Sequence, residues 1–372
     1  MTAWAKTWNW ALLLTLVLSG ASAWAESITI RDIAGRDVRL SGPAERIVAV
    51  GPGSARLVAY FGAISRLVGI EAMDQQPPGG RAYALAHHPR FMDLPLIGQG
   101  GPGRSVDAEA ILGLRPDAVI ANLFDRADAE RLSRQVRRPV VMVSFGSDGV
   151  YDPELVLRSI EIVGTVLGLP ERADDLTSFI EATEADLARR VASARQASEP
   201  SVFVGAISMR GQHGIASTQS RFLPLTLLHT PSPADHLAQG TRHLFIDLEQ
   251  LLLWDPRHIF IDTSGLPRVI KEVNRQPGFF ARLEAFRRQR VLTLFPFNHY
   301  GTNIELAFAN AYFIGSVLYP QAFADVDPHE KLEALAGFFL GPVDTGPLYR
   351  EYPGFQLLTL HDDRLAIEAY DH

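Results

Sequence analysis

The sequence predicts an α/β fold of two parallel-sheet lobes joined by a long α-helix, with the functional site in the gap between the lobes. Short continuous apolar runs alternate with helical patterns in both halves of the chain, as in parallel sheets covered on both faces. Helical periodicity fills Tyr151–Arg195, and segment 106–122 aligns without gaps on 246–262. The expected divisions are a signal peptide (1–25), an N-terminal lobe (26–150), a connecting helix (151–197), a C-terminal lobe (198–345) and a C-terminal tail (346–372).

The N-terminus has the pattern of a secretory signal peptide. Lys6 precedes the apolar run Ala11–Leu18, and Ala23-Trp24-Ala25 matches a cleavage signal before Glu26. A membrane anchor would need about 20 apolar residues, and this run is shorter. We therefore expect the mature chain to be exported to the periplasm.

The composition narrows the class of protein. The chain has no cysteine, so an exported fold depends on burial rather than on disulfides, and no lipid-modified cysteine is available at the cleavage site. This predicts a free periplasmic protein that is not lipid-anchored. The formal net charge of −7 argues against general nucleic-acid binding, which needs a basic face.

The first half begins with an extended segment, Ile28–Leu40, and then alternates strands with helices. Residues 73–105 are rich in Gly and Pro and interrupt this alternation. The expected strands are Arg46–Val50, Leu67–Ile70, Ala118–Ala121 and Val140–Phe145, and the expected helices are Ala55–Phe61, Asp107–Leu114 and Asp128–Val136.

The connecting helix has a strong start signal. Asp152 is a capping residue, Pro153 occupies the first helical position and Glu154 adds an acid to the first turn. The apolar pattern pauses at Gly168-Leu169-Pro170 and then resumes. Because proline lacks a backbone donor and clashes with the preceding turn, we expect a kink or break near Leu169.

The alternation restarts in the second half. The tail after Gly341 is punctuated by Gly and Pro, and we expect it to lie over the second lobe or to be loosely held. The expected strands are Val202–Ile207, His258–Ile261 and Arg290–Phe295, and the expected helices are Leu248–Leu253, Pro267–Asn274, Phe279–Phe286 and Asn303–Leu318.

The aligned segments predict a structural repeat, one copy in each lobe. Each reads as a helix N-cap, an acid in the first turn, an apolar helix, a proline stop and a buried strand. Any helix–proline–strand unit shares part of this pattern, so the identities carry the prediction. They pair Asp107 with Asp247, Glu109 with Glu249, Leu112 with Leu252 and Pro116 with Pro256.

Common catalytic motifs find little support. Residues 98–103 satisfy G-x-G-x-x-G, but Pro102 lies inside the motif, and the following helix and acidic residue are misplaced for a dinucleotide site. A glycine-rich loop lining a cleft is the better interpretation. The sequence contains no H-E-x-x-H, no G-x-S-x-G and no cysteine nucleophile, which disfavours a hydrolase.

Two loops in the second half, 208–214 and 297–303, follow strands directly and combine polar with aromatic residues. Ligands bind beyond the carboxyl ends of parallel strands, so both loops are placed to face one. Arg210 could grip an anionic group, and His299 and Tyr300 could stack, donate hydrogen bonds or ligate a metal. Asn303 has an equally good interpretation as a helix N-cap.

The first half contributes further candidates at strand ends. Gly51–Ser54 presents backbone donors at a helix start, which suits an anionic group. The metal candidates are His213 and His299. The residues expected to face a ligand are Gly51, Pro52, Gly53, Ser54, Gln99, Asn122, Phe124, Phe145, Met209, Arg210, His213, Asn298, His299, Tyr300 and Asn303.

These features together resemble a known family, the helix-linked periplasmic solute-binding proteins of ABC importers that serve ferric siderophores, haem and cobalamin. The resemblance rests on the Gly-Pro-Gly loop after the first strand of the lobe, "AEAILGLRPDAVIA", the connecting helix and "DLEQLLLWDPRHIFID". Segment 298–320 is similar to members that bind iron complexes. The resemblance covers nearly all of the mature chain and implies a non-enzymatic protein with limited hinge motion.

The resemblance also implies a role for one acid in each lobe. Glu109 and Glu249 match the positions that form salt bridges with arginines of the membrane permease. A simpler interpretation is that acids in a first turn interact favourably with the helix dipole, by about 0.3–1 kcal/mol. The symmetry of the repeat favours docking on a two-fold permease dimer.

We therefore predict a monomeric binding protein without an intrinsic cofactor, which delivers an iron chelate to an inner-membrane ABC permease. A molybdate, tungstate or cobalamin binder of the same fold is the alternative within the class. In the oxyanion case, Gly51–Ser54 and Arg210 would dominate. The alternative from another class is an exported metal-dependent enzyme that uses His213 and His299.

Overall fold

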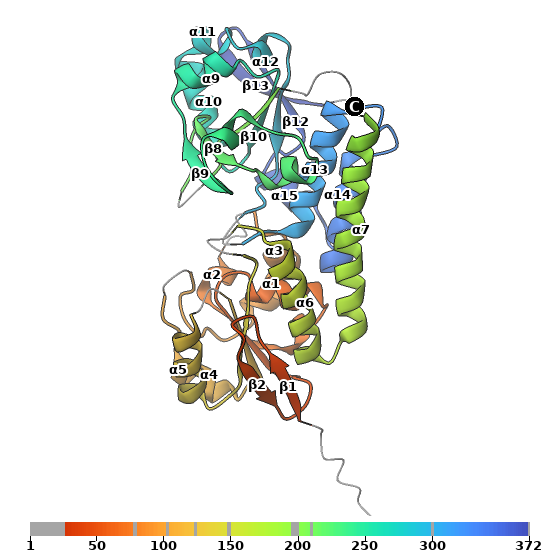
Figure 1. The fold of residues 1–372 in the computed structure, drawn as a ribbon. Coiled ribbons are helices and arrows are strands. Elements are labelled where there is room, and N and C mark those ends of the chain that lie inside the picture. The colour runs from red at the N-terminus through yellow and green to blue at the C-terminus, as the bar shows by residue number, and fades with distance from the viewer. Residues whose placement is uncertain are drawn as a thin grey trace, which may run out of the picture.

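The computed structural model describes residues 27–76, 80–101, 104–122, 125–146, 150–194, 201–208, 211–298 and 301–370. The predicted signal peptide lies outside these ranges. Figure 1 shows two α/β lobes, one above the other, with the long helix α7 (Pro170–Ala194) running beside both. Within the described ranges, no helix combines the length and apolar character needed to cross a membrane. The predicted fold class is confirmed.

The first lobe is built on a four-stranded parallel sheet in the order β4-β3-β5-β6. Every residue of its inner strands is buried, which explains the continuous apolar runs. The strands are β3 (Ile47–Val50), β4 (Leu67–Gly69), β5 (Ala118–Asn122) and β6 (Val140–Val143); the helices around them are α1 (Ser54–Tyr60), η1 (Ile64–Arg66), α4 (Ala108–Leu114) and α5 (Arg126–Val136).

The predicted extended segment Ile28–Leu40 forms an antiparallel hairpin, β1 (Ile28–Arg31) and β2 (Asp37–Leu40). Asp32 is fully buried between them and accepts a hydrogen bond from the backbone N–H of Met142 at 3.1 Å. Arg36 pairs with Asp32 and donates to the carbonyl of Val140 at 2.7 Å. The hairpin is thereby fixed to β6.

The Gly/Pro-rich stretch 73–105 contains helices that its composition did not indicate. They are α2 (Ala72–Gln75) and α3 (Ala82–Met92), and α3 accommodates Pro89 in its interior. α3 has only 11 residues, too few to show a clear helical repeat of apolar residues. Packing against neighbouring elements must therefore stabilise it. Two of those neighbours, α14 and α15, belong to the second lobe.

The predicted connecting helix is two helices. α6 (Pro153–Leu167) ends at Gly168, whose φ of 67° is left-handed, and α7 starts at Pro170. α6 packs against β6 and β1 of the first lobe and alongside α7. The break near Leu169 was predicted, but the single strut over 151–197 is corrected: α6 belongs to the first lobe, and α7 alone connects the lobes (Figure 1).

The second lobe contains a five-stranded sheet in the order β13-β12-β11-β10-β7. Strands β7, β10 and β11 are parallel, and β12 and β13 extend the sheet as an antiparallel hairpin. The described part of the predicted tail, residues 346–370, is therefore an integral part of the lobe, because its strands complete the sheet. The strands are β7 (Val202–Gly205), β10 (His258–Asp262), β11 (Val291–Leu294), β12 (Gln356–His361) and β13 (Arg364–Ala369).

Helices cover this sheet, and a separate hairpin, β8 (Ser217–Ser220) with β9 (Arg242–Phe245), lies beside β7. The predicted helix 279–286 is two short helices, because the chain turns between them. The helices are α8 (Leu223–Leu227), η3 (Pro233–His236), α9 (Leu248–Trp254), α10 (Leu266–Arg275), α11 (Pro277–Phe280), α12 (Glu284–Arg287), α13 (Ile304–Leu318), α14 (Pro328–Leu340) and α15 (Gly346–Glu351).

The sequence repeat is matched by a repeat of structure. α4 and α9 each have seven residues and lead to the five-residue strands β5 and β10. Each helix ends in a left-handed residue directly before the matched proline: Arg115 has a φ of 50° and Asp255 a φ of 36°. The two segments thus share helix length, helix ending and strand position.

Candidate functional site

The turn after β3 lies against the end of β5. A Cβ atom built on Gly51 would lie 2.0 Å from the carbonyl oxygen of Asn122, and the φ of Gly51 is +81°, so this position requires glycine. The Asn122 amide donates to the carbonyl of Pro52 at 2.7 Å. Two predicted site segments, Gly51–Ser54 and Asn122, are therefore in contact.

A turn of the second lobe meets this region. Asn298 and Thr302 form an antiparallel bridge that closes the turn. Gly53 in the first lobe and Gly301 in the second both lie against Arg56 Nη1, which is 3.2 Å from a Cβ built on either glycine. The structure thus places the predicted residues Gly53 and Asn298 on facing turns of the two lobes.

Phe145, predicted from its place at the end of a strand, belongs to the same contact. Its ring carbon Cε2 is 3.1 Å from a Cβ built on Gly53, and its ring lies 5.0 Å from the guanidinium carbon of Arg56. Phe145 is almost fully buried. Phe145 therefore packs against Gly53, Gly301 and Arg56 and presents little surface to a solute.

Other predicted residues have different surroundings. Asn303 is fully buried and donates to the carbonyls of Phe297 and Gly80, at 2.9 and 3.3 Å, and its side chain makes no N-cap hydrogen bond to α13. Asn303 occupies the predicted N-cap position of α13, although its side chain instead contacts the first lobe at Gly80. Its contact with a ligand stays a prediction. Five predicted residues lie outside the described ranges: Phe124, Met209, Arg210, His299 and Tyr300.

His213 lies in an aromatic cluster with His243 and Phe245. Its ring centroid is 5.7 Å from that of His243 and 4.9 Å from that of Phe245. The backbone N–H of Ile207, just past β7, donates to the carbonyl of Ser217 in β8, and Ser217 pairs with Phe245 in β9. The cluster therefore lies near the carboxyl end of β7. The residues that the structure describes contain no group of three or more candidate metal ligands.

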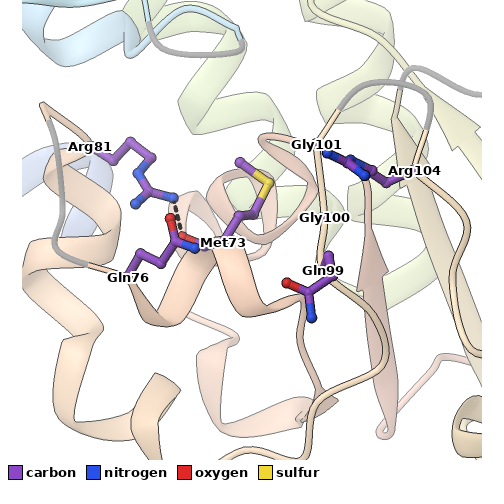
Figure 2. A pocket seen from close by; sticks show the side chains of 7 residues that line it. All are labelled: Met73, Gln76, Arg81, Gln99, Gly100, Gly101 and Arg104. Atoms are coloured by element: carbon purple, nitrogen blue, oxygen red, sulfur yellow. Dashed lines mark hydrogen bonds between the residues drawn. The ribbon is translucent and has the colours of Figure 1, made fainter.

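A pocket of about 300 Å³ lies in the first lobe, and all of its lining residues belong to the Gly/Pro-rich stretch 73–105. Figure 2 shows Arg81, Gln76 and Met73 on one side of the pocket, and the other four lining residues on the opposite side: Gln99, Gly100, Gly101 and Arg104. Gln99, which the sequence analysis places among the residues that face a ligand, is one of the lining residues. The lining residues are Met73, Gln76, Arg81, Gln99, Gly100, Gly101 and Arg104.

Buried contacts hold Arg81 in place. Its Nη1 donates to the carbonyl of Met73 at 2.6 Å and lies 3.5 Å from Asp74 Oδ1. Tyr83 donates to the same carboxylate oxygen at 2.6 Å. Burial raises the pKa of Asp74, which the hydrogen bond from Tyr83 and the charge of Arg81 oppose. Arg104, across the pocket, is exposed.

Glu71 joins the pocket to the Gly51 turn. Its Oε2 accepts a hydrogen bond from the Gly51 backbone N–H at 2.9 Å, and its Cβ is 2.9 Å from a Cβ built on Gly100. Burial is the main cause that raises the pKa of this carboxyl to about 7. Glu71 is therefore a neutral-pH titrating group beneath the pocket.

The shifted pKa predicts how stability depends on pH. The pKa rises from 4.5 in the unfolded chain to about 7 in the fold, so protonation stabilises the fold at low pH. This contribution is lost as pH rises between these values, by about 1.4 kcal/mol per unit. Glu71→Gln should remove this slope in urea unfolding measured between about pH 5 and 8.

Glu154→Gln, at an exposed acid in the first turn of α6, is the matched control and should keep the wild-type slope. Parallel stability curves for wild type and Glu71→Gln would contradict the assignment.

Four pocket residues that sequence reasoning missed are Met73, Gln76, Arg81 and Arg104. They fall in a segment where glycine and proline obscure any periodicity, and the only signal there was two arginines within a glycine-rich stretch. The sequence does not show that Arg81 and Arg104 line the same pocket, so neither could be predicted as an anion ligand.

The paired acids occupy equivalent, accessible places. Glu109 and Glu249 lie in the first turns of α4 and α9, and both are exposed. Neither forms an ion pair with another residue in the described part of the chain. Their carboxylates are thus available to a partner.

Known proteins share this architecture. The chain is 24% identical over 338 residues to the molybdate-binding protein MolA of Haemophilus influenzae, covering 85% of this chain and 92% of the relative. A periplasmic solute binding protein from Veillonella parvula has a TM-score of 0.68 at 18% identity, covering 88% of this chain and 96% of that one. The molybdate-bound structure of MolA has a TM-score of 0.65 at 18% identity, covering 85% and 99%.

A model of the family described as periplasmic binding protein matches residues 47–296, which is more than half of the chain and includes both copies of the repeat. The solved structures show the same two-lobed fold. The chain therefore belongs to the periplasmic binding protein family, the non-enzymatic solute-binding components of ABC importers.

Proposed function

We propose that this protein captures a small metal oxyanion of the molybdate or tungstate class and delivers it to an ABC permease. The observation that carries the proposal is the pocket with Arg81 and Arg104 on opposite sides. Guanidinium groups bind oxyanions through paired, charge-assisted hydrogen bonds, and the planar fork suits several oxygens of one anion. The amides of Gln76 and Gln99 add further donors.

The size of the pocket favours a small solute. Its volume of about 300 Å³ is at the lower end of the range, roughly 300–1,000 Å³, that accommodates drug-sized ligands. A curated relative that aligns over 92% of its own length is named as a molybdate-binding protein, which supports the same class. The oxyanion, an alternative from the sequence, therefore becomes the leading candidate.

The iron chelate predicted from the sequence is the second candidate. The observation in its favour is the cluster of His213, His243 and Phe245 near the carboxyl end of β7, where Phe245 is 65% exposed. An exposed aromatic surface with two imidazoles could pack against an aromatic chelator. No such surface lines the arginine pocket.

The repeat of α4 and α9 supports the proposal that the partner is an ABC permease. Glu109 and Glu249 present one exposed carboxylate from each lobe, at equivalent positions of matched helices. A two-fold permease that presents a basic residue to each lobe would accept both acids at once.

Calorimetric titration tests the proposal. We expect molybdate and tungstate to bind with one site per chain and sulfate to bind more weakly, while haemin and a ferric hydroxamate give no heat. Tight binding of either iron chelate without molybdate binding would support the second candidate and refute the first.

A further inference from the structure

The helix that carries Glu249 also carries exposed apolar surface. Leu253, in the last turn of α9, is 79% exposed, and Phe245, two residues before the N-cap Asp247, is 65% exposed. These are the two most exposed large apolar side chains among the described residues. Glu249 and Leu253 are four residues apart in α9, so their side chains lie on one face of the helix. An exposed acid and two exposed apolar side chains are thus gathered within segment 245–253.

The repeat makes the first lobe an internal comparison. α4 and α9 have the same length and the same left-handed ending, so side chains at matched positions leave the two helices in matched directions. At two of these positions the second lobe has a large apolar side chain where the first has a small residue. The matched pairs are Glu109 with Glu249, Gly113 with Leu253 and Ser105 with Phe245. The acid is therefore present in both lobes, and the apolar side chains beside it are present in the second alone.

The aspartate at the N-cap differs between the lobes as well. Asp107 accepts a hydrogen bond from the Ala110 backbone N–H at 2.9 Å, whereas Asp247 makes no side-chain cap hydrogen bond. Asp247 is exposed and forms no ion pair with any residue that the structure describes. In the second lobe, two carboxylates are thus available together with the apolar side chains.

The stability of the isolated chain does not account for this surface. An exposed apolar side chain stabilises a protein only when another surface removes it from water. Single exposed apolar residues are common, but apolar side chains gathered beside charged ones are typical of an interface, in which the apolar groups give affinity and the charges give orientation. The chain belongs to a family whose members partner with an ABC permease, and Glu249 is continuous with the apolar residues.

We propose that Phe245 and Leu253 form an apolar anchor by which the second lobe docks on the permease, while the first lobe docks without such an anchor. The permease surface that receives α9 then presents a basic residue with apolar side chains beside it. This inference rests on the proposed docking of Glu109 and Glu249. Because a two-fold permease offers the same surface to both lobes, the second lobe contributes the larger share of the docking affinity.

Binding to the cognate permease, reconstituted in lipid nanodiscs and measured by surface plasmon resonance, tests the proposal. The test variants are Phe245→Ser, Leu253→Ser and the two together. We expect each single substitution to weaken docking about tenfold, the change in affinity that corresponds to the burial of one such side chain. Both positions are exposed, so the variants should unfold as cooperatively as the wild type, and their affinity for molybdate in calorimetry should not change.

Two further variants use the rest of the molecule as a comparison. Nothing lies within 4 Å of a Cβ built on Gly113, so a large side chain fits there. Ser105→Phe with Gly113→Leu gives the first lobe an anchor of its own and should strengthen docking about tenfold. Ile367→Ser is the matched control, because Ile367 is an exposed apolar residue of the second lobe on β13, outside segment 245–253. It should dock as the wild type does.

Glu249→Arg, measured in the same way, separates the anchor from the proposed docking acid. Loss of docking in Glu249→Arg, with wild-type docking in the Phe245 and Leu253 variants, would refute the anchor and leave the acid in place. The converse would refute the acid and support the anchor. A wild type that does not bind the permease refutes both, while calorimetry with molybdate still decides the proposed solute.

Other occupants of this surface give different results. Weaker binding of molybdate or haemin by Leu253→Ser would assign the surface to the solute and overturn the proposal. Equal binding of the wild type to nanodiscs without permease would assign it to the lipid. A wild-type dimer in sedimentation that Leu253→Ser dissociates would assign it to a second copy of the chain. Each of these outcomes contradicts the anchor.

Discussion

Arg104→Gln should weaken molybdate binding by about 10- to 100-fold, because one charge-assisted hydrogen bond contributes about 1.5–3 kcal/mol. Arg104 is exposed at the rim of the pocket, so its replacement should leave the thermal unfolding temperature within about 1 °C. Calorimetric titration of both proteins measures the change. Arg134→Gln, at an exposed arginine of α5 outside the pocket, is the control and should bind as the wild type does.

Arg81→Gln should lose at least as much affinity, but this residue also bonds to Met73 and Asp74 inside the lobe. Its substitution leaves the Asp74 carboxylate without that cation, so the free energy of unfolding should fall as well. Comparison with Arg81→Lys, which keeps the charge, separates the two effects. If Arg104→Gln and Arg81→Lys both bind molybdate as tightly as the wild type, the pocket is not the solute site.

Reversing both docking acids, Glu109→Arg with Glu249→Arg, should abolish uptake of the solute while its affinity for the isolated protein stays unchanged. Each carboxylate is expected to meet a permease arginine, and losing such a pair costs about 2 kcal/mol or more at each lobe. The two lobes act on one permease dimer, so the losses combine. Transport into proteoliposomes that contain the permease measures uptake, and calorimetry measures affinity.

Glu154→Arg provides the control for charge. It reverses an exposed acid in the first turn of α6, outside the repeat, and should leave uptake as in the wild type. A loss of solute affinity in the double reversal would show that Glu109 and Glu249 face the solute instead of the permease. Normal uptake would show that docking relies on other residues.

The sequence predicted best the elements whose burial leaves a recognisable pattern of apolar residues in the chain. Strands such as Val140–Val143 are buried on both faces and therefore read as continuous apolar runs. The repeat was visible because both copies need the same N-terminal acid and the same proline stop. The break at Gly168 followed from the local rules for glycine and proline.

The pocket could not be predicted in the same way. Arg81 and Arg104 are far along the sequence from the ends of β4 and β5, and only the folded chain brings them to one pocket. Arg56 was within a predicted helix, where an arginine is normally solvated, and its burial depends on a contact with Thr302, 246 residues later in the chain. Such contacts leave no local pattern.

The hairpin of β12 and β13 has a consequence for the order of folding. Strand β12 pairs with β11, and β13 pairs only with β12, so the sheet of the second lobe is incomplete until residues 356–369 are available. The first lobe has no strand from this segment. During synthesis from the N-terminus, the first lobe would thus be complete while the second still lacks two strands. Completion of the second sheet therefore depends on a contact between distant parts of the chain, the pairing of Leu292 with Leu357.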